Sequence, residues 1–305
     1  MSDFKRFMAV WLSAVVLGTM LTVGALRIST TTREQAQRGD LATDNNHFSV
    51  VYQGFIPGYS TNYPDYYLCI NDLKNNPLQM SIRLFIQNQE AAGYYFRVEQ
   101  HSAPPAGWTI YPYNVGLVAI DGTLDFVYSG MYRALPSSIP EGELTETVNL
   151  DMKAYVDAGY TTLYSADNFT VTYHMIDRMS PSWTVIEYNN FDDGTNQGWT
   201  PGSTTTQYYR SFRYSLYSGT GYLTKTFNVM GYSKAYLICP IRQTGTITPS
   251  ILIDGTKYFQ SDAYVYSGIW YSYTVPLPVY PNPTPLVRIE GLGGAYLDDV
   301  YVIGQ

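Results

Sequence analysis

Short runs in which apolar and polar residues alternate dominate the chain from His47 onward, and each run is closed by a turn sequence. In the run 148–154 the even positions are apolar and the odd positions are polar, so we expect one face in a core and the other in water. Turn sequences such as Asp121-Gly122 separate the runs. Many short strands at regular spacing are typical of a β-sandwich. The strands predicted in this part are 48–52, 66–70, 80–87, 94–100, 108–111, 116–120, 124–128, 147–155 and 169–175.

Residues 7–26 form an uncharged, apolar run that predicts a membrane helix. About 20 residues at 1.5 Å each span roughly 30 Å, the thickness of a bilayer core. Basic residues usually flank a membrane helix on its cytoplasmic side, and Lys5 and Arg6 precede the run. The orientation is less well defined by this rule because basic residues also follow the run, namely Arg27, Arg33 and Arg38. We therefore predict a single-pass anchor over residues 1–28 that contacts membrane lipid, a polar stalk over 29–46, and residues 29–305 outside the cell. Cleavage of a signal sequence after position 25 is the alternative.

The composition favours an exterior location and disfavours nucleic acid as a partner. Charged residues make up 14% of the chain, against about a quarter in typical proteins, while tyrosine supplies 31 residues. The net charge is −7, and no basic patch is interleaved with aromatic residues. Asn168-Phe169-Thr170 is an acceptable N-glycosylation sequon, so Asn168 is a candidate acceptor.

Two cysteines, Cys69 and Cys239, fall one in each half of the β-rich region. Two buried thiols that act as small hydrophobic residues are one interpretation. An interdomain disulfide is the other.

The C-terminal third carries paired motifs at its two ends. Phe191-Asp192-Asp193-Gly194 with Gly198-Trp199 opens it, and Tyr296-Leu297-Asp298-Asp299-Val300 closes it. Together they resemble the first and last strands of jelly-roll carbohydrate-binding modules, or galactose-binding-like domains. The resemblance implies a jelly roll over residues 188–305 in which these two strands lie side by side.

The middle region has a weaker resemblance. The segment 83–88, then Ala106-Gly107-Trp108, then Pro140-Glu141-Gly142, is similar to the skeleton of immunoglobulin-like domains of surface proteins. It implies an immunoglobulin-like β-sandwich over 47–180, with 177–188 as a linker or shared edge. The expected fold class is therefore all-β, an N-terminal transmembrane helix followed by an immunoglobulin-like sandwich and a C-terminal jelly roll.

Catalytic motifs are scarce. The sequence has no Gly-x-Ser-x-Gly elbow, zinc motif or phosphate-binding glycine loop, and His47, His101 and His174 are far apart. A pair of carboxylates for glycoside hydrolysis stays open, since 25 acidic residues are available. We expect a protein that is not an enzyme.

The jelly-roll resemblance implies a structural calcium ion. In those families an acidic residue of the opening strand and an aspartate of the closing strand bind Ca²⁺ together with carbonyl oxygens. The matching positions are Asp192 and Asp298, with Asp193 and Asp299 as alternates. The alternative is that Asp193-Gly194 is a turn and Asp298-Asp299 a solvated strand end.

Aromatic side chains in the same region are candidates for sugar binding, because the apolar C–H faces of pyranose rings stack on Tyr and Trp. Trp199 belongs instead to the expected core. The candidate ligand-binding residues are Tyr208, Tyr209, Tyr264, Tyr266 and Trp270, with Tyr271 beside them.

The leading hypothesis is a membrane-anchored extracellular surface protein that adheres to glycans or surface-layer proteins through its C-terminal jelly roll. The alternative is a self-assembling structural subunit of a surface filament, secretion complex or surface layer. The basic pair, apolar helix and β-domain resemble archaeal pilins and archaellum-associated proteins. Phe7, however, stands where those proteins have a small residue.

Overall fold

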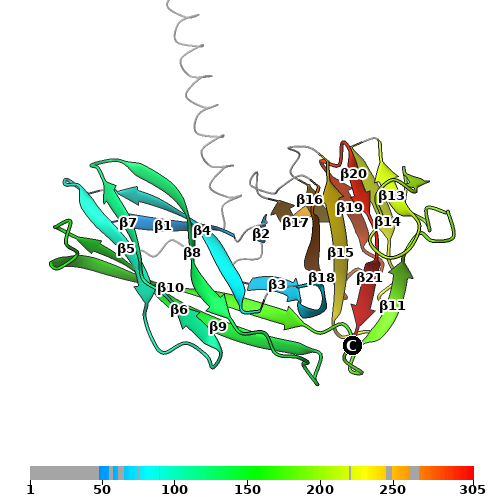
Figure 1. Cartoon of the computed structure of the whole chain (residues 1–305), viewed down its shortest axis with the longest axis horizontal. Coiled ribbons are helices and arrows are strands. Elements are labelled where there is room, and N and C mark those ends of the chain that lie inside the picture. Colours follow the sequence, from blue (N-terminus) through cyan, green and yellow to red (C-terminus); the bar gives the residue numbers. More distant parts are fainter. Residues whose placement is uncertain are drawn as a thin grey trace, which may run out of the picture. The chain divides into compact units, whose positions relative to one another are not determined.

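The computed structural model describes residues 48–54, 58–60, 65–73, 76–88, 90–219, 221–244, 249–261 and 268–305, and the fold of these residues is all-β. These residues belong to one compact unit, Leu41–Gln305. A short 3₁₀ helix, η1 (Ile70–Asp72), accompanies the strands (Figure 1). The strands of the first half are β1 (Phe48–Gly54), β2 (Gly58–Ser60), β3 (Asp65–Cys69), β4 (Leu78–Asn88), β5 (Tyr94–Gln100), β6 (Trp108–Ile110), β7 (Tyr113–Val118), β8 (Thr123–Arg133), β9 (Glu143–Tyr155) and β10 (Leu163–Ile176).

The strands of the second half follow a linker that runs to Trp183. They are β11 (Thr184–Asn189), β12 (Ser203–Thr205), β13 (Ser215–Ser218), β14 (Tyr222–Thr226), β15 (Ala235–Gln243), β16 (Ser250–Ile253), β17 (Thr256–Ser261), β18 (Trp270–Leu277), β19 (Leu286–Glu290), β20 (Ala295–Leu297) and β21 (Val300–Gly304).

The first sandwich consists of a sheet in the order β1-β4-β8-β6 and a sheet in the order β3-β10-β9-β5-β7. Apolar residues at alternate positions of both sheets face each other and form its core. Val148, Leu150 and Met152 of β9 lie in this core, as the alternation of the sequence predicts. That this sandwich is immunoglobulin-like remains a prediction.

The second sandwich consists of a seven-stranded sheet in the order β11-β21-β15-β20-β13-β12, in which β18 pairs with β15, and a sheet in the order β14-β19-β16-β17-β2. Its core contains Leu237 and Val302 from the first of these sheets and Ile251 and Ile289 from the second. We call the face of the seven-stranded sheet that points away from this core the outer face.

The two ends of the second sandwich lie side by side, because β11 pairs antiparallel with β21. The opening strand itself ends at Asn189, earlier than the resemblance implied. Phe191 lies in a turn with φ of 59°, and its carbonyl accepts a hydrogen bond from the Gly194 N–H at 2.9 Å. The cause is local, since Asp193 accepts a hydrogen bond from the Thr195 N–H and stabilises a turn at this point.

The first sandwich covers part of the outer face. Tyr236, Ile238 and Ile303 of the second sandwich share a small buried cluster with Ile176 and Trp183. Cys69 lies in the same cluster. Strand β2 adds a further connection, because it lies in the chain between β1 and β3 of the first sandwich yet pairs with β17.

Cys69 and Cys239 are both free and buried, so the interdomain disulfide is not formed. Burial raises the pKa of the Cys69 thiol to about 11. These thiols pack as small hydrophobic side chains.

The predicted anchor, residues 7–26, and the stalk, 29–46, lie outside the described residues. Within the part of the chain that the structure describes, no helix has the length and apolar character needed to cross a membrane.

Candidate functional site

One row of side chains crosses four strands of the seven-stranded sheet. The strand register pairs Tyr217 of β13 with Tyr296 of β20, Tyr296 with Arg242 of β15, and Arg242 with Trp270 of β18. Residues paired directly across strands point to the same face. Three strand spacings of about 4.8 Å give the row a length of roughly 14 Å.

This row lies on the outer face. Its chain neighbours Leu216, Leu297 and Ile241 all belong to the core of the second sandwich. Because successive side chains of a strand point to opposite faces, the row residues point away from that core.

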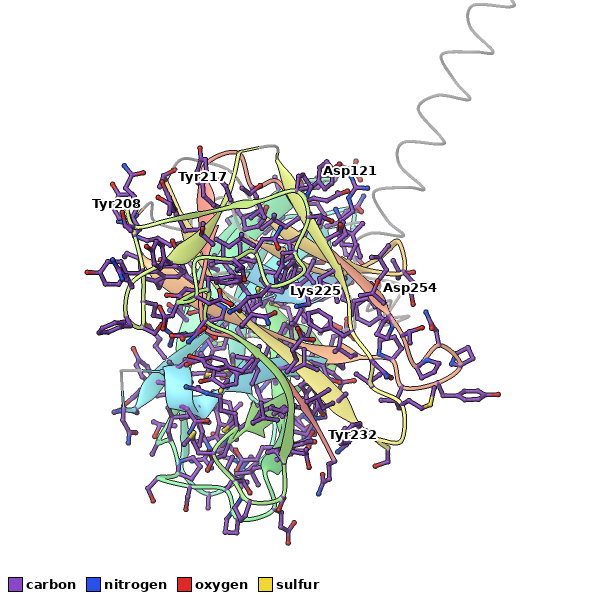
Figure 2. The ribbon with its side chains drawn as sticks, turned by 90° about the vertical axis from the view of Figure 1, so that its right-hand side faces the viewer. Asp121, Tyr208, Tyr217, Lys225, Tyr232 and Asp254 are labelled. Carbon is purple, nitrogen blue, oxygen red and sulfur yellow. The ribbon has the colours of Figure 1, made fainter. Side chains whose placement is uncertain are left out.

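Tyr208, from the loop before β13, lies against the middle of the row. The guanidinium carbon of Arg242 lies 3.7 Å from the Tyr208 ring centroid. The Tyr296 ring lies 5.0 Å from that of Tyr208 and 5.1 Å from that of Tyr217. Figure 2 shows Tyr208 and Tyr217 in the same region of the second sandwich. The Tyr296 hydroxyl donates to Gln207 Oε1 at 2.9 Å, so this aromatic cluster holds its loop in place.

The row combines aromatic side chains with one charged hydrogen-bond donor. Tyr208 is 37% exposed, while Tyr217, Arg242 and Trp270 are half-buried. Tyr296, by contrast, is covered by its aromatic neighbours, and burial raises its pKa. The site therefore presents aromatic faces and a fixed guanidinium at the surface.

A cavity of about 170 Å³ begins where the row ends. Trp270 belongs to both the row and the cavity lining, because β18 lies at the edge of its sheet, where β15 is its one partner among the described strands. The second sandwich contributes the residues of β18 and part of β17, and the first contributes β3, η1 and the start of β4. The lining includes Tyr67, Asp72, Gln79, Tyr258, Tyr271, Ser272 and Thr274.

Asp72 forms a polar junction in the wall of this cavity. Its side chain is 2% exposed, and its Oδ1 accepts hydrogen bonds from Arg178 Nη1 at 2.8 Å and Arg210 Nη2 at 2.7 Å. The Ser272 hydroxyl donates to Oδ2 at 2.6 Å. Burial alone would raise the pKa of Asp72, but Arg210, Ser272 and Arg178 outweigh it and lower this pKa.

The structure joins two of the predicted ligand-binding residues, Tyr208 and Trp270, through Arg242. Tyr209 is exposed and lies outside the row. Tyr264 and Tyr266 lie outside the described residues, and Tyr271 lines the cavity. Trp199 is fully buried, as predicted, and its indole N–H donates to Asn189 Oδ1 at 3.0 Å.

Arg242, Tyr217 and Tyr296 were missed from the sequence. Arg242 had one usable signal, since it is the single charged residue of β15 and directly follows the uncharged run 235–241. Its relation to Tyr296 and Trp270 depends on strand register between segments that are distant in the chain.

The predicted calcium ligands Asp192 and Asp298 both accept hydrogen bonds from the loop that precedes β13. Asp298 is fully buried, and its Oδ2 accepts hydrogen bonds from the backbone N–H groups of Arg210 and Ser211 at 2.6 and 3.2 Å. Asp192 Oδ1 accepts one from the Arg213 N–H at 3.1 Å. Burial raises the pKa of Asp298 to about 6. A calcium ion here would share the two carboxylates with these donors and need further oxygen ligands from backbone or water.

The alternates have other partners: Asp193 stabilises its own turn, and Asp299 Oδ1 accepts the Tyr188 hydroxyl at 2.6 Å. Among the described residues, no three His, Cys, Asp or Glu side chains are grouped as a metal site. The calcium ion stays a prediction.

The remaining candidate residues lie away from the row. His174 stacks on Tyr67 with ring centroids 4.4 Å apart, and its Nδ1 lies 2.6 Å from Glu143 Oε1. His101 Nδ1 lies 2.8 Å from Asp151 Oδ1, and His47 is outside the described residues. Asn168 is exposed on β10, where its amide donates to the Leu150 carbonyl, so its glycosylation stays a prediction.

Comparison with known proteins gave structural similarities only. No protein-family model and no curated protein matches the chain. The CBM22-1 xylan-binding domain from Paenibacillus barcinonensis Xyn10C is similar at 12% identity over 39% of this chain and 93% of that one, with a TM-score of 0.31. A carbohydrate-binding module of the β-sandwich superfamily is similar at 14% identity over 85% of this chain and 98% of that one, with a TM-score of 0.28.

A third similarity is to the CBM22-1-GH10 modules of the Clostridium thermocellum endo-1,4-β-D-xylanase 10B, at 11% identity over 40% of this chain and 28% of that one, with a TM-score of 0.30. At these identities and TM-scores the similarities identify neither a ligand nor a binding residue of this chain.

Proposed function

We propose that the second sandwich binds a glycan chain along this row, through the accessible side chains of Tyr217, Arg242 and Trp270, with Tyr296 as a buried support. The observation that carries this proposal is the alignment of aromatic residues and one arginine across four strands of an outer sheet face. A row of about 14 Å is longer than a single pyranose ring, so it suits a chain of sugars.

The chemistry of the row suits a sugar ligand. The Tyr208, Tyr217 and Trp270 rings offer apolar faces for the C–H groups of pyranose rings. The Arg242 guanidinium carries several N–H donors in a fixed plane for hydroxyl oxygens. Because Tyr208 holds this guanidinium at 3.7 Å, the donors are oriented before the ligand arrives.

The proposal is for binding of the glycan and not for its hydrolysis. Glycoside hydrolysis generally uses two carboxylates on either side of the scissile bond. Among the described residues of the row and the cavity, Asp72 is the only carboxylate, and two arginines already pair with it.

The test is binding of the full chain to a panel of xylan, mannan, β-glucan and cell-envelope polysaccharides. Arg242→Ala should weaken saturable binding by about tenfold or more, because a hydrogen bond from a charged group is worth about 1.5–3 kcal/mol. The matched control is Arg288→Ala, since Arg288 lies over the Tyr222 ring at 4.6 Å but belongs to the other sheet.

Equal loss in both variants would contradict a site on the outer face. If a well-folded protein binds no member of the panel, the glycan proposal fails and the alternative, a structural subunit of a surface assembly, becomes the better hypothesis.

The same proposal includes display at the cell surface for adhesion. Residues 7–26 would anchor the chain in the membrane, with 29–305 outside the cell. Membrane fractionation followed by protease treatment of intact cells tests this arrangement. Recovery of the protein with the cytoplasmic fraction would contradict it.

A structural calcium ion at Asp192 and Asp298 is the remaining part of the proposal. We expect millimolar calcium to raise the melting temperature by several degrees relative to chelator, because an ion that binds only the folded state stabilises it. Asp298→Asn should abolish the difference. Asp121→Asn, which alters an exposed carboxylate on the first sandwich, should keep it (Figure 2). If the melting temperature of the wild-type protein is the same in calcium and in chelator, the calcium ion is excluded.

A further inference from the structure

The row does not continue freely beyond Trp270. β18 is the edge of its sheet, and the space beyond it is walled by β3 and η1 of the first sandwich. Asp72 of η1 is fixed in this wall by Arg210 and Ser272 of the second sandwich and by Arg178 of the linker. A chain that follows the row toward β18 therefore meets a closed end.

The closed end contains the cavity of about 170 Å³. A cavity of roughly 150 Å³ is known to hold one benzene ring, so this one has room for a single six-membered ring and not for a chain. Its aromatic wall includes Tyr67, Tyr258 and Trp270. One sugar ring would find apolar contacts on these side chains.

A buried polar atom lies in the cavity lining. Thr274 is 5% exposed, and its Oγ1 has no hydrogen-bond partner among the residues that the structure describes. Buried hydroxyl groups are normally paired, and leaving one unpaired costs about 1–3 kcal/mol. A ligand hydroxyl would satisfy this atom.

We propose that this cavity receives the terminal sugar of the glycan, so that the protein recognises chain ends and not chain interiors. The inference rests on the proposed function, since the row must guide the chain to the cavity. It adds a specificity that the row alone does not have, because an open row accepts any stretch of a polymer.

The experiment measures the amount of full-length protein bound per gram of xylan, mannan and β-glucan, each intact and after limited acid hydrolysis. An end-binding site predicts that capacity rises in proportion to the number of chain ends. Thr274→Val, which keeps the shape of the side chain, should weaken binding by about five- to tenfold, the effect of one lost hydrogen bond. Its melting temperature should not fall, because the hydroxyl is unpaired in the free protein.

Ser215→Ala is the matched control. Ser215 is also fully buried in the seven-stranded sheet, its hydroxyl is unpaired among the described residues, and it does not line the cavity. It should leave affinity unchanged.

The outcomes separate the two proposals. Suppose that Arg242→Ala abolishes binding, that the amount of protein bound per gram does not change with the number of chain ends, and that Thr274→Val binds normally. The chain-end inference is then overturned and the glycan row stands. If no polysaccharide binds in either form, both proposals are overturned.

Discussion

At the scale of single residues, Glu143 is the clearest case of a charge that the fold holds in place. Its carboxylate lies 2.6 Å from His174 Nδ1 and 2.6 Å from Lys234 Nζ, and it accepts the Tyr236 hydroxyl at 3.0 Å. Burial acts to raise its pKa, but His174, Lys234 and Tyr236 outweigh burial and lower the pKa to about 2. Glu143 therefore connects β9 of the first sandwich to β15 of the second.

This lowered pKa predicts a specific acid sensitivity. A carboxyl whose folded pKa lies below its unfolded value of about 4.3 stabilises the protein at neutral pH and loses that contribution as the pH falls toward 2. Between pH 5 and 3 the wild-type protein should lose on the order of 1–2 kcal/mol more stability than Glu143→Gln. Urea unfolding at a series of pH values measures the difference.

Glu141→Gln is the control, because Glu141 is exposed two residues away. It should follow the wild-type pH dependence. If the unfolding free energies of wild type and Glu143→Gln change with pH in parallel, then His174, Lys234 and Tyr236 do not stabilise the charged carboxylate.

At the scale of strands, the alternation of the sequence predicted most of the first sandwich. The run 94–100 corresponds to β5, and 147–155 lies within β9. One residue of β9 departs from the pattern: Asp151 was expected in water but is 8% exposed, because it pairs with His101 at 2.8 Å. Period-two patterns describe a strand by itself and cannot include a partner from another segment, such as His101 directly after β5.

The candidate site was harder to predict for the same reason. Aromatic clustering indicated Tyr208 and Trp270, but clustering along the chain says nothing about strand register. The row requires β13, β20, β15 and β18 to align, and these strands come from separate parts of the sequence. The cavity wall beyond Trp270 could not be predicted from the sequence either, because residues of both sandwiches form it.

The contact between η1 and β18 gives a prediction at this scale. Asp72→Ala should destabilise the protein by about 3 kcal/mol, because removal of the buried carboxylate leaves two partly buried arginine charges without their partner. The control is Glu290→Ala, which removes an exposed partner of Arg288 and should cost less than about 1 kcal/mol. Urea unfolding measures both variants. Equal effects would show that the Asp72 junction is no stronger than a surface ion pair.

At the scale of the whole molecule, the two sandwiches have separate cores but share structure between them. Ile238 and Tyr236 of the second sandwich pack with Ile176 of the first, β2 pairs with β17, and Asp72 bonds across the same contact. Small independent domains would each unfold on their own. Here the shared buried cluster couples the stability of one sandwich to the other.

We therefore expect a single calorimetric transition for the wild-type protein, with the van't Hoff enthalpy equal to the calorimetric one. Ile238→Ser combined with Asp72→Ala removes an apolar and a polar part of the contact, so two transitions should appear. Leu84→Ala, in the core of the first sandwich alone, should lower the melting temperature and keep one transition, because it leaves the contact intact. Two transitions in the wild type would mean that the sandwiches are independent, and the wall at Trp270 would then move relative to the row. A chain-end site needs that wall fixed, so the cooperativity of unfolding also bears on how the glycan is recognised.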